Sequence, residues 1–415
     1  MKWIASFLLL PWLLACSVYQ KDTPDGYAHL RAIPAVKSRE NDHLPLQYRL
    51  YHTSDTSGVC YFELDPADYL QKRDSLETWF RHAQLQLILK KGTLTKEALF
   101  QADKTLTFRN DSIFSDSLVF RVPARTDLWV DVKVTDLNKY SYRQQQNWWL
   151  RPESIQTEHF VLQDPASAAP FVTHFAPGPI LHLRSAYFRD STLQARIYRG
   201  LDIPAAAPFA WGNHYADFSK PDTTYVVSFA GDALDIDLDQ GYALLNLPRN
   251  SQFASGFFAY PTASQQNYLR CMSYFCTQDE LLLLQDSTTA LPAYENFWLR
   301  AAKQDIVKKQ MLQQEYMRRV DAANAAYSSY KPGSMTDRGM IYIVFGPPDR
   351  VQQEAFHEIW MYNQLAGSEV DFLFFQDRDR QAPNHYYLER GSQYKNPYYI
   401  QVENWRTGVV EFTGK

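Results

Sequence analysis

Asp337 and Arg338 are the polar pair in this 415-residue sequence that most resembles a reactive site. In an enzyme, the carboxylate could act as a general base and the guanidinium could bind an anion. Such a hydrolase would need a neighbour such as His357 or His385. In a structural role, Asp337 would cap a turn and Arg338 would pair with another carboxylate. We favour the structural role, because one carboxylate without a converging acid or histidine is weak support for catalysis.

An acidic repeat between residues 235 and 241 resembles a calcium-binding loop. Asp235, Asp237 and Asp239 alternate with apolar residues. A calcium loop of this type requires glycine at its sixth position and a bidentate acid at its twelfth. Those positions hold Gln240 and Asn246. We therefore predict an edge strand with one acidic face.

Two further patterns resemble catalytic motifs without completing them. Residues 328–331 match S-x-x-K, but the companion S-D-N and K-T-G elements are missing. A helix C-terminus explains this segment better, because a final lysine favours that end of the helix dipole. His357 and Glu358 lack the second histidine of H-E-x-x-H. Glu358 begins an alternating strand, and we expect its side chain to face solvent or Arg338. We predict no metal site, no cofactor and no catalysis.

The residues around the Asp337–Arg338 pair predict a turn, a buried strand and a second turn. Pro332-Gly333 ends the preceding helix. Thr336 and the carboxylate of the pair hold the first turn through local hydrogen bonds, and Gly339 permits an unusual backbone angle. Residues 340–345 are all apolar or aromatic, which predicts a strand covered on both faces. The prolines of residues 346–349 end that strand.

This stretch resembles the GWxTD-domain proteins, a family of Bacteroidetes lipoproteins. Ser334 stands where the motif has tryptophan. The helix before the motif, residues 319–327, and the alternating strand 358–362 also fit the family. The resemblance implies an envelope lipoprotein module without a known catalytic activity. The matching residues are Ile343 and those that we regard as a candidate interaction site, namely Gly333, Thr336, Asp337, Arg338, Gly339, Tyr342, Gly346, Pro348 and Asp349.

The N-terminus predicts a lipoprotein signal. A short basic start is followed by an apolar run, and residues 13–16 (Leu-Leu-Ala-Cys) read as a lipobox. The run is too short to span a bilayer. We predict a signal peptide over residues 1–15, acylation of Cys16 by fatty acids such as palmitate, and a tether over residues 16–44. Ser17 fits transport to the outer membrane, with the exposed face left open. The alternatives are an ordinary signal peptide or a buried helix with a chance cysteine.

Composition narrows the class of protein. Hydrophobic residues make up 45% of the chain and aromatic residues 15%, which favours extensive cores and β structure. The net charge of −4 argues against nucleic-acid binding. Cys60 reads as a small buried hydrophobe. Cys271 and Cys276 are close enough in sequence to form a small-loop disulfide in an oxidising periplasm.

The pattern of strands and turns predicts a mainly β protein with a C-terminal α+β module. Short alternating segments indicate two tandem β-sandwich-like domains, over residues 45–164 and 171–288, joined by a Pro- and Ala-rich linker. The module over residues 293–415 should contain a long helix and a short antiparallel sheet. Helical spacing at Val320, Ala323, Asn324 and Tyr327 indicates a helix packed on its own domain. A membrane-surface helix is the alternative, but acidic residues dilute its positive face.

Taken together, these features predict a lipid-anchored outer-membrane protein that acts as a structural or protein-binding accessory. Its partners would be the membrane, through the lipid, and another envelope protein. A glycan- or peptidoglycan-binding module that uses exposed tryptophan and tyrosine is one alternative. A hydrolase centred on Asp337 and Arg338 is the other.

Overall fold

The computed structural model describes residues 47–410, except 92–96, 111, 125, 127, 141, 150–158, 164–174, 178, 202, 212–215, 239–240, 247–253, 261–264, 354–356, 366–367, 377–381 and 383–384. The predicted signal peptide, Cys16 and the tether lie outside the described residues, as does the Pro- and Ala-rich linker, residues 164–170.

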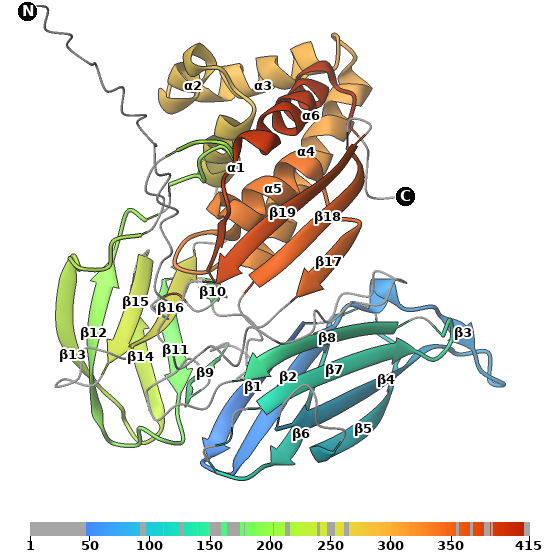
Figure 1. The fold of residues 1–415 in the computed structure, drawn as a ribbon, viewed down its shortest axis with the longest axis vertical. Helices are drawn as coiled ribbons and strands as arrows, with labels where there is room; N and C mark the ends of the chain where they lie inside the picture. Colours follow the sequence, from blue (N-terminus) through green and yellow to red (C-terminus); the bar gives the residue numbers. More distant parts are fainter. Residues whose placement is uncertain are drawn as a thin grey trace, which may run out of the picture. The chain divides into compact units, whose positions relative to one another are not determined.

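The first β unit is built from two sheets that share one hydrophobic core (Figure 1). Alternating apolar residues of β4 point into this core, which also contains the buried Cys60. One sheet has the order β1 (Gln47–Ser54), β2 (Ser57–Leu64), β6 (Phe114–Arg121). The other has the order β3 (Lys72–Arg73), β4 (Trp79–Lys90), β7 (Leu128–Asp136), β8 (Tyr142–Trp149), and β5 (Ala98–Phe108) also pairs with β4.

The second β unit likewise contains two sheets around a core of its own. The predicted acidic edge strand is confirmed as β14, whose Leu234 and Ile236 are buried while Asp235 and Asp237 are exposed. The larger sheet has the order β10 (Phe175–Pro177), β16 (Ala254–Tyr260), β15 (Gly241–Asn246), β12 (Thr192–Tyr198), β13 (Thr223–Ser228). The smaller has the order β14 (Ala233–Asp237), β11 (Ile180–Arg184), β9 (Val161–Leu162).

The C-terminal part combines helices with a four-stranded antiparallel sheet (Figure 1). Both contribute to one large aromatic core. The predicted mainly β fold with a C-terminal α+β module is confirmed. The helices are α1 (Gln265–Cys271), α2 (Gln278–Gln285), α3 (Ala290–Ala301), α4 (Ile306–Tyr327), α5 (Asp337–Phe345) and α6 (Lys395–Thr407). The sheet has the order β17 (Arg350–Gln353), β18 (His357–Leu365), β19 (Ser368–Gln376), β20 (Tyr386–Leu388).

The predicted strand over residues 340–345 is wrong, because this segment belongs to helix α5. Its apolar residues are buried on every side, against α4, α6 and β20. A helix enclosed in this way shows the same unbroken apolar run as a buried strand, so periodicity cannot separate the two. Thr336 followed by an acidic residue is the helix N-terminal signal that decides between them.

Two boundaries around the helices also differ from expectation. Helix α4 ends at Tyr327 with Ser328 as its C-cap, five residues before Pro332-Gly333. Residues 265–285, placed by the sequence in the second β unit, form α1 and α2 and pack in the C-terminal core.

The long helix α4 packs on its own domain, with Leu312, Tyr316 and Val320 fully buried. No helix in the described part of the chain has both the length and the apolar composition that crossing a membrane requires. Cys271 and Cys276 carry free thiols, so the disulfide considered from the sequence is not formed. Burial raises the pKa of the Cys271 thiol to about 12.

Candidate functional site

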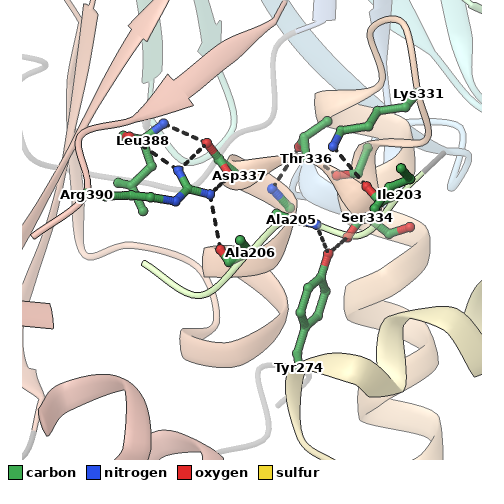
Figure 2. Close-up of polar contacts among 12 residues, drawn as sticks. Ile203, Ala205, Ala206, Tyr274, Lys331, Ser334, Thr336, Asp337, Leu388 and Arg390 are labelled. Carbon is green, nitrogen blue, oxygen red and sulfur yellow. Dashed lines mark hydrogen bonds and ion pairs between the residues drawn. The ribbon is translucent and has the colours of Figure 1, made fainter. Parts of the chain in front are cut away.

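Asp337, the first residue of α5, forms a buried ion pair with Arg390 (Figure 2). Its Oδ1 accepts a hydrogen bond from Nη2 of Arg390 at 2.8 Å, and its Oδ2 accepts one from Nη1 at 3.0 Å. The same Oδ2 accepts the backbone N–H of Leu388 at 2.8 Å. Both carboxylate oxygens are therefore engaged, and they connect the start of α5 to β20 and to the chain that follows it.

Thr336 explains why a helix begins at this aspartate. Its side-chain oxygen accepts the backbone N–H of Gly339 at 3.0 Å and donates to the carbonyl of Gly333 at 2.7 Å. The cap satisfies a helix N–H that would otherwise lack a partner. The N-terminal end of a helix also favours a negative charge, which Asp337 supplies. The cap and the helix dipole thus place the carboxylate at the start of α5 independently of residues distant in the sequence.

Arg338 points to a different set of partners from those of Asp337. Its Nη1 lies 3.3 Å from Oε1 of Glu358, and both side chains are buried. Its guanidinium also lies over the rings of Tyr386, at 4.1 Å, and Tyr327, at 5.1 Å. The sequence analysis left Glu358 facing either solvent or Arg338, and the structure places it against Arg338.

A strap of residues 203–209, from the loop between β12 and β13, crosses this region (Figure 2). Arg390 donates from Nη2 to the carbonyl of Ala206 at 3.1 Å, so the partner of Asp337 also holds the strap. Tyr274 donates its hydroxyl to the carbonyl of Ser334 at 2.8 Å and accepts the N–H of Ala205 at 3.3 Å. The motif turn, Arg390 and the strap form one connected polar site.

A segment in the C-terminal part of the chain matches a known protein family. Residues 249–407 match the family model described as the GWxTD domain. The chain contains a GWxTD domain. None of the curated proteins compared with the chain matches it. The match begins just before β16, whereas the sequence analysis started its C-terminal module at residue 293; the predicted domain boundaries remain predictions.

Gly333 and Gly339 of the GWxTD motif are required by close packing rather than by unusual backbone angles. A Cβ at Gly333 would overlap the carbonyl oxygen of Ala323 on α4, and a Cβ at Gly339 would overlap the carbonyl oxygen of Gly333. The sequence analysis assigned Gly339 a conformational role, which is wrong. Gly346 does adopt a positive φ of 87°, and it packs against the guanidinium of Arg319.

The end of the motif connects α5 to the sheet. Tyr362 donates its hydroxyl to the carbonyl of Gly346 at 2.8 Å. The N–H of Asp349 donates to the carbonyl of Met361 at 3.0 Å, next to the first pair of β17 and β18. Tyr342 makes an edge contact with Tyr327, and Pro348 is half-buried. The chain passes from helix α5 into the sheet through the contacts of Tyr342, Gly346, Pro348, Asp349 and Tyr362.

Ser334, which replaces the motif's tryptophan, is fully buried, and its hydroxyl makes no hydrogen bond among the described residues. Its backbone is held on both sides, because its N–H donates to Oδ1 of Asn324 at 2.8 Å and its carbonyl accepts from Tyr274. A buried hydroxyl without a partner costs about 1–3 kcal/mol.

We therefore expect Ser334→Ala to raise the free energy of unfolding of the GWxTD domain by about 1 kcal/mol. Backbone hydrogen bonds of residue 334 do not depend on the side chain and should persist. Amide hydrogen exchange in α5 is the measurement, and slower exchange is the expected result. Faster exchange would show that the hydroxyl stabilises the turn.

Ser329 and His385 form a second buried polar pair, with Oγ 2.8 Å from Nδ1. This is the distance of a nucleophile and its base, but both residues are buried and the charged groups that act on His385 are the cations Lys331 and Arg338. Burial first, and then these cations, lower the pKa of His385 well below its ordinary value. The ring is therefore neutral in the fold, between Tyr330 and Tyr387.

This histidine predicts acid sensitivity. In the unfolded chain His385 takes up a proton below about pH 6.5, whereas the folded chain resists protonation, so acid favours unfolding. Stability should be complete above that pH and fall as pH decreases. We expect His385→Gln to make the loss of stability between about pH 7 and pH 5 shallower. Urea unfolding at each pH measures it, and an unchanged slope would contradict the assignment.

Several residues of the site were not singled out from the sequence. Arg390 lies 53 positions from Asp337, and Tyr274 lies 60 positions from Ser334. No spacing rule connects residues so far apart. The described residues contain no group of three or more His, Cys, Asp and Glu side chains that could hold a metal ion.

Proposed function

We propose that this protein is a lipid-anchored component of the cell envelope whose GWxTD domain is a structural or protein-binding module rather than an enzyme. The observation that supports a non-catalytic role is the position of Asp337. Both of its oxygens are occupied by Arg390 and the Leu388 N–H inside the fold. A general base must instead reach a substrate proton.

The other candidate groups give no better support to a hydrolase. Arg338 is enclosed by Glu358 and two tyrosine rings, so it does not present a guanidinium to a substrate anion. Ser329 and His385 are 5% and 2% exposed. Their surroundings are cationic, whereas a catalytic histidine needs a group that stabilises its protonated form.

Glycan binding by a row of aromatic side chains is the weaker alternative. The most exposed tryptophan and tyrosine residues in the described part of the chain come from separate elements. They are Trp79 on β4, Tyr140 after β7, Trp211 in the loop before β13, and Tyr399 on α6. A sugar-binding face needs several such rings side by side, and these positions do not supply one.

The lipid anchor follows from the sequence alone and needs a direct test. Cells grown with a radioactive fatty acid should label the wild-type protein and should not label Cys16→Ala. Cys276→Ala is the matched control, because Cys276 is a partly exposed free thiol that the proposal does not acylate. An unlabelled wild-type chain, or label that survives Cys16→Ala, would remove the anchor.

The protein-binding role can be tested by photo-crosslinking in intact cells. Leu283 on α2 and Val307 on α4 are exposed apolar side chains of the GWxTD domain, 51% and 67% exposed. A crosslinking residue at either site should give a discrete adduct with an envelope protein. The same residue at Tyr140, in the first β unit, is the control. Adducts at none of these sites, or equally at all three, would contradict the proposal.

A further inference from the structure

The strap makes its hydrogen bonds to the GWxTD domain through backbone atoms, while Ala205, Ala207 and Phe209 also pack against the domain's core. Lys331 donates from Nζ to the carbonyl of Ile203 at 3.0 Å, and Gly391 donates its N–H to the carbonyl of Pro208 at 3.1 Å. With the contacts to Ala205 and Ala206 described above, four strap residues are bound at main-chain atoms. The side chain of Ile203 is 69% exposed, so the contacts of the strap do not recognise this side chain.

The strap also consists mostly of residues with small side chains. Three consecutive alanines follow Pro204 and precede Pro208, so the side chains are small. Proline fixes its own φ and disfavours helix at the residue before it, which reduces the conformational entropy lost on docking. Apart from the exposed Ile203, only Phe209 carries a large group, and its ring contacts Tyr398 and Tyr399 of α6.

The donors that face the strap are oriented by contacts within the GWxTD domain. Asp337 holds the guanidinium of Arg390 in a bidentate pair, and the carbonyl of Ser334 fixes the hydroxyl of Tyr274. Burial lowers the pKa of Lys331 to about 8, and its ammonium reaches the strap at its N-terminal end. A site whose donors are already held in place before the ligand binds loses less conformational entropy on binding.

We propose that the GWxTD motif, with Tyr274, Lys331 and Arg390, is a binding site for a peptide of small apolar residues that is recognised at its backbone, and that strap 203–209 is its resident intramolecular ligand. This inference rests on the proposed protein-binding function and gives the class of its ligand. A partner segment of the same chemistry would bind by replacing the strap. In this proposal the motif residues orient the hydrogen-bond donors of Arg390 and Tyr274, and these donors bind the peptide.

The test uses the full chain with residues 203–209 replaced by seven glycine and serine residues. A fluorescein-labelled peptide with the sequence of residues 203–210 is titrated with this variant and with wild type, and anisotropy is recorded. We expect saturable binding to the variant and binding at least about 10-fold weaker to wild type. The attached strap competes at an effective concentration in the millimolar range.

N-methylated peptides test the geometry of the complex. Methylation at Ala205 removes the N–H that Tyr274 accepts and should weaken binding about 10-fold. Methylation at Ala207 is the matched control, because its N–H makes no hydrogen bond within the described part of the chain, and it should change binding little. Lys331→Met in the strap-replaced chain should also weaken binding, through loss of the contact to residue 203.

A milder variant covers the case in which strap replacement prevents folding. Ala205→Pro in the otherwise intact chain removes the same N–H from the resident strap, so added peptide should bind this variant more tightly than wild type. Failure of the peptide to bind either folded variant, or equal effects of the two N-methyl groups, would overturn the inference. Crosslinked adducts at Leu283 or Val307 would be unaffected by that outcome, so the broader proposal is judged separately.

Discussion

Asp337→Asn is expected to lower the free energy of unfolding of the GWxTD domain by about 3–5 kcal/mol. The substitution keeps the shape of the side chain but removes the charge that faces Arg390. The side chains of both residues are at most 10% exposed, so water cannot replace the lost partner. The contact to the Leu388 N–H can survive, because an amide oxygen also accepts, and the loss comes mainly from the stranded guanidinium.

Asp279→Asn is the matched control for this prediction. Asp279 also lies in the first turn of a helix of the same domain, but its side chain is exposed. Its loss should change stability by less than about 1 kcal/mol. Because the chain has several cores, amide hydrogen exchange in α5 and β20 localises the effect better than one global transition.

Two outcomes would count against this account of Asp337. Equal exchange in Asp337→Asn and Asp279→Asn would show that the buried pair contributes little to the fold. A turnover reaction lost in Asp337→Asn, with exchange in α5 unchanged, would instead make the carboxylate catalytic.

Gly339→Ala should destabilise the GWxTD domain by about 3 kcal/mol or more. Helix propensity alone predicts the opposite sign, because alanine is favoured over glycine inside a helix by about 1 kcal/mol. The added methyl group would overlap the backbone carbonyl of Gly333, which has no flexible side chain that could move aside. Relief requires the motif turn to separate from α5, and that turn also carries the hydroxyl group of Thr336 that caps the helix.

Ser334→Ala is the control for a substitution in the same turn. It removes an atom instead of adding one, and we expect it to stabilise the domain by about 1 kcal/mol. Hydrogen exchange of residues 337–345 and thermal unfolding of both variants measure the difference. A Gly339→Ala chain at least as stable as wild type would show that the turn can move at little cost. It would also remove close packing as the reason for glycine at this position.

The strap connects these two predictions. Arg390 uses one nitrogen for both Oδ1 of Asp337 and the carbonyl of Ala206, so a change at Asp337 should also loosen residues 203–209. Exchange at these amides should then rise together with exchange in α5 in Asp337→Asn. In Asp279→Asn, both segments should remain protected.

Local patterns in the sequence were sufficient for much of the fold. Alternating apolar residues located β4 and β7, and the acidic alternation at 235–237 located an edge strand, because side chains of a strand point to opposite faces. Helical spacing located α4 for the corresponding reason. Cys60 was correctly assigned to a core, and the motif of residues 333–349 indicated the GWxTD domain. Each of these properties is encoded within about twenty neighbouring residues.

The secondary structure of the motif and its contacts with distant residues depended on the tertiary structure. Residues 340–345 carry no usable periodicity, because they are enclosed on all sides, and only their neighbours reveal a helix. Arg390 meets Asp337 across 53 positions, and residues 203–206 reach the motif across more than a hundred. Pairings of this length depend on how the chain closes on itself rather than on adjacent residues. The sequence therefore determined many of the elements and indicated the family of the C-terminal domain, whereas the packing of helix, sheet and strap determined the nature of α5 and the site.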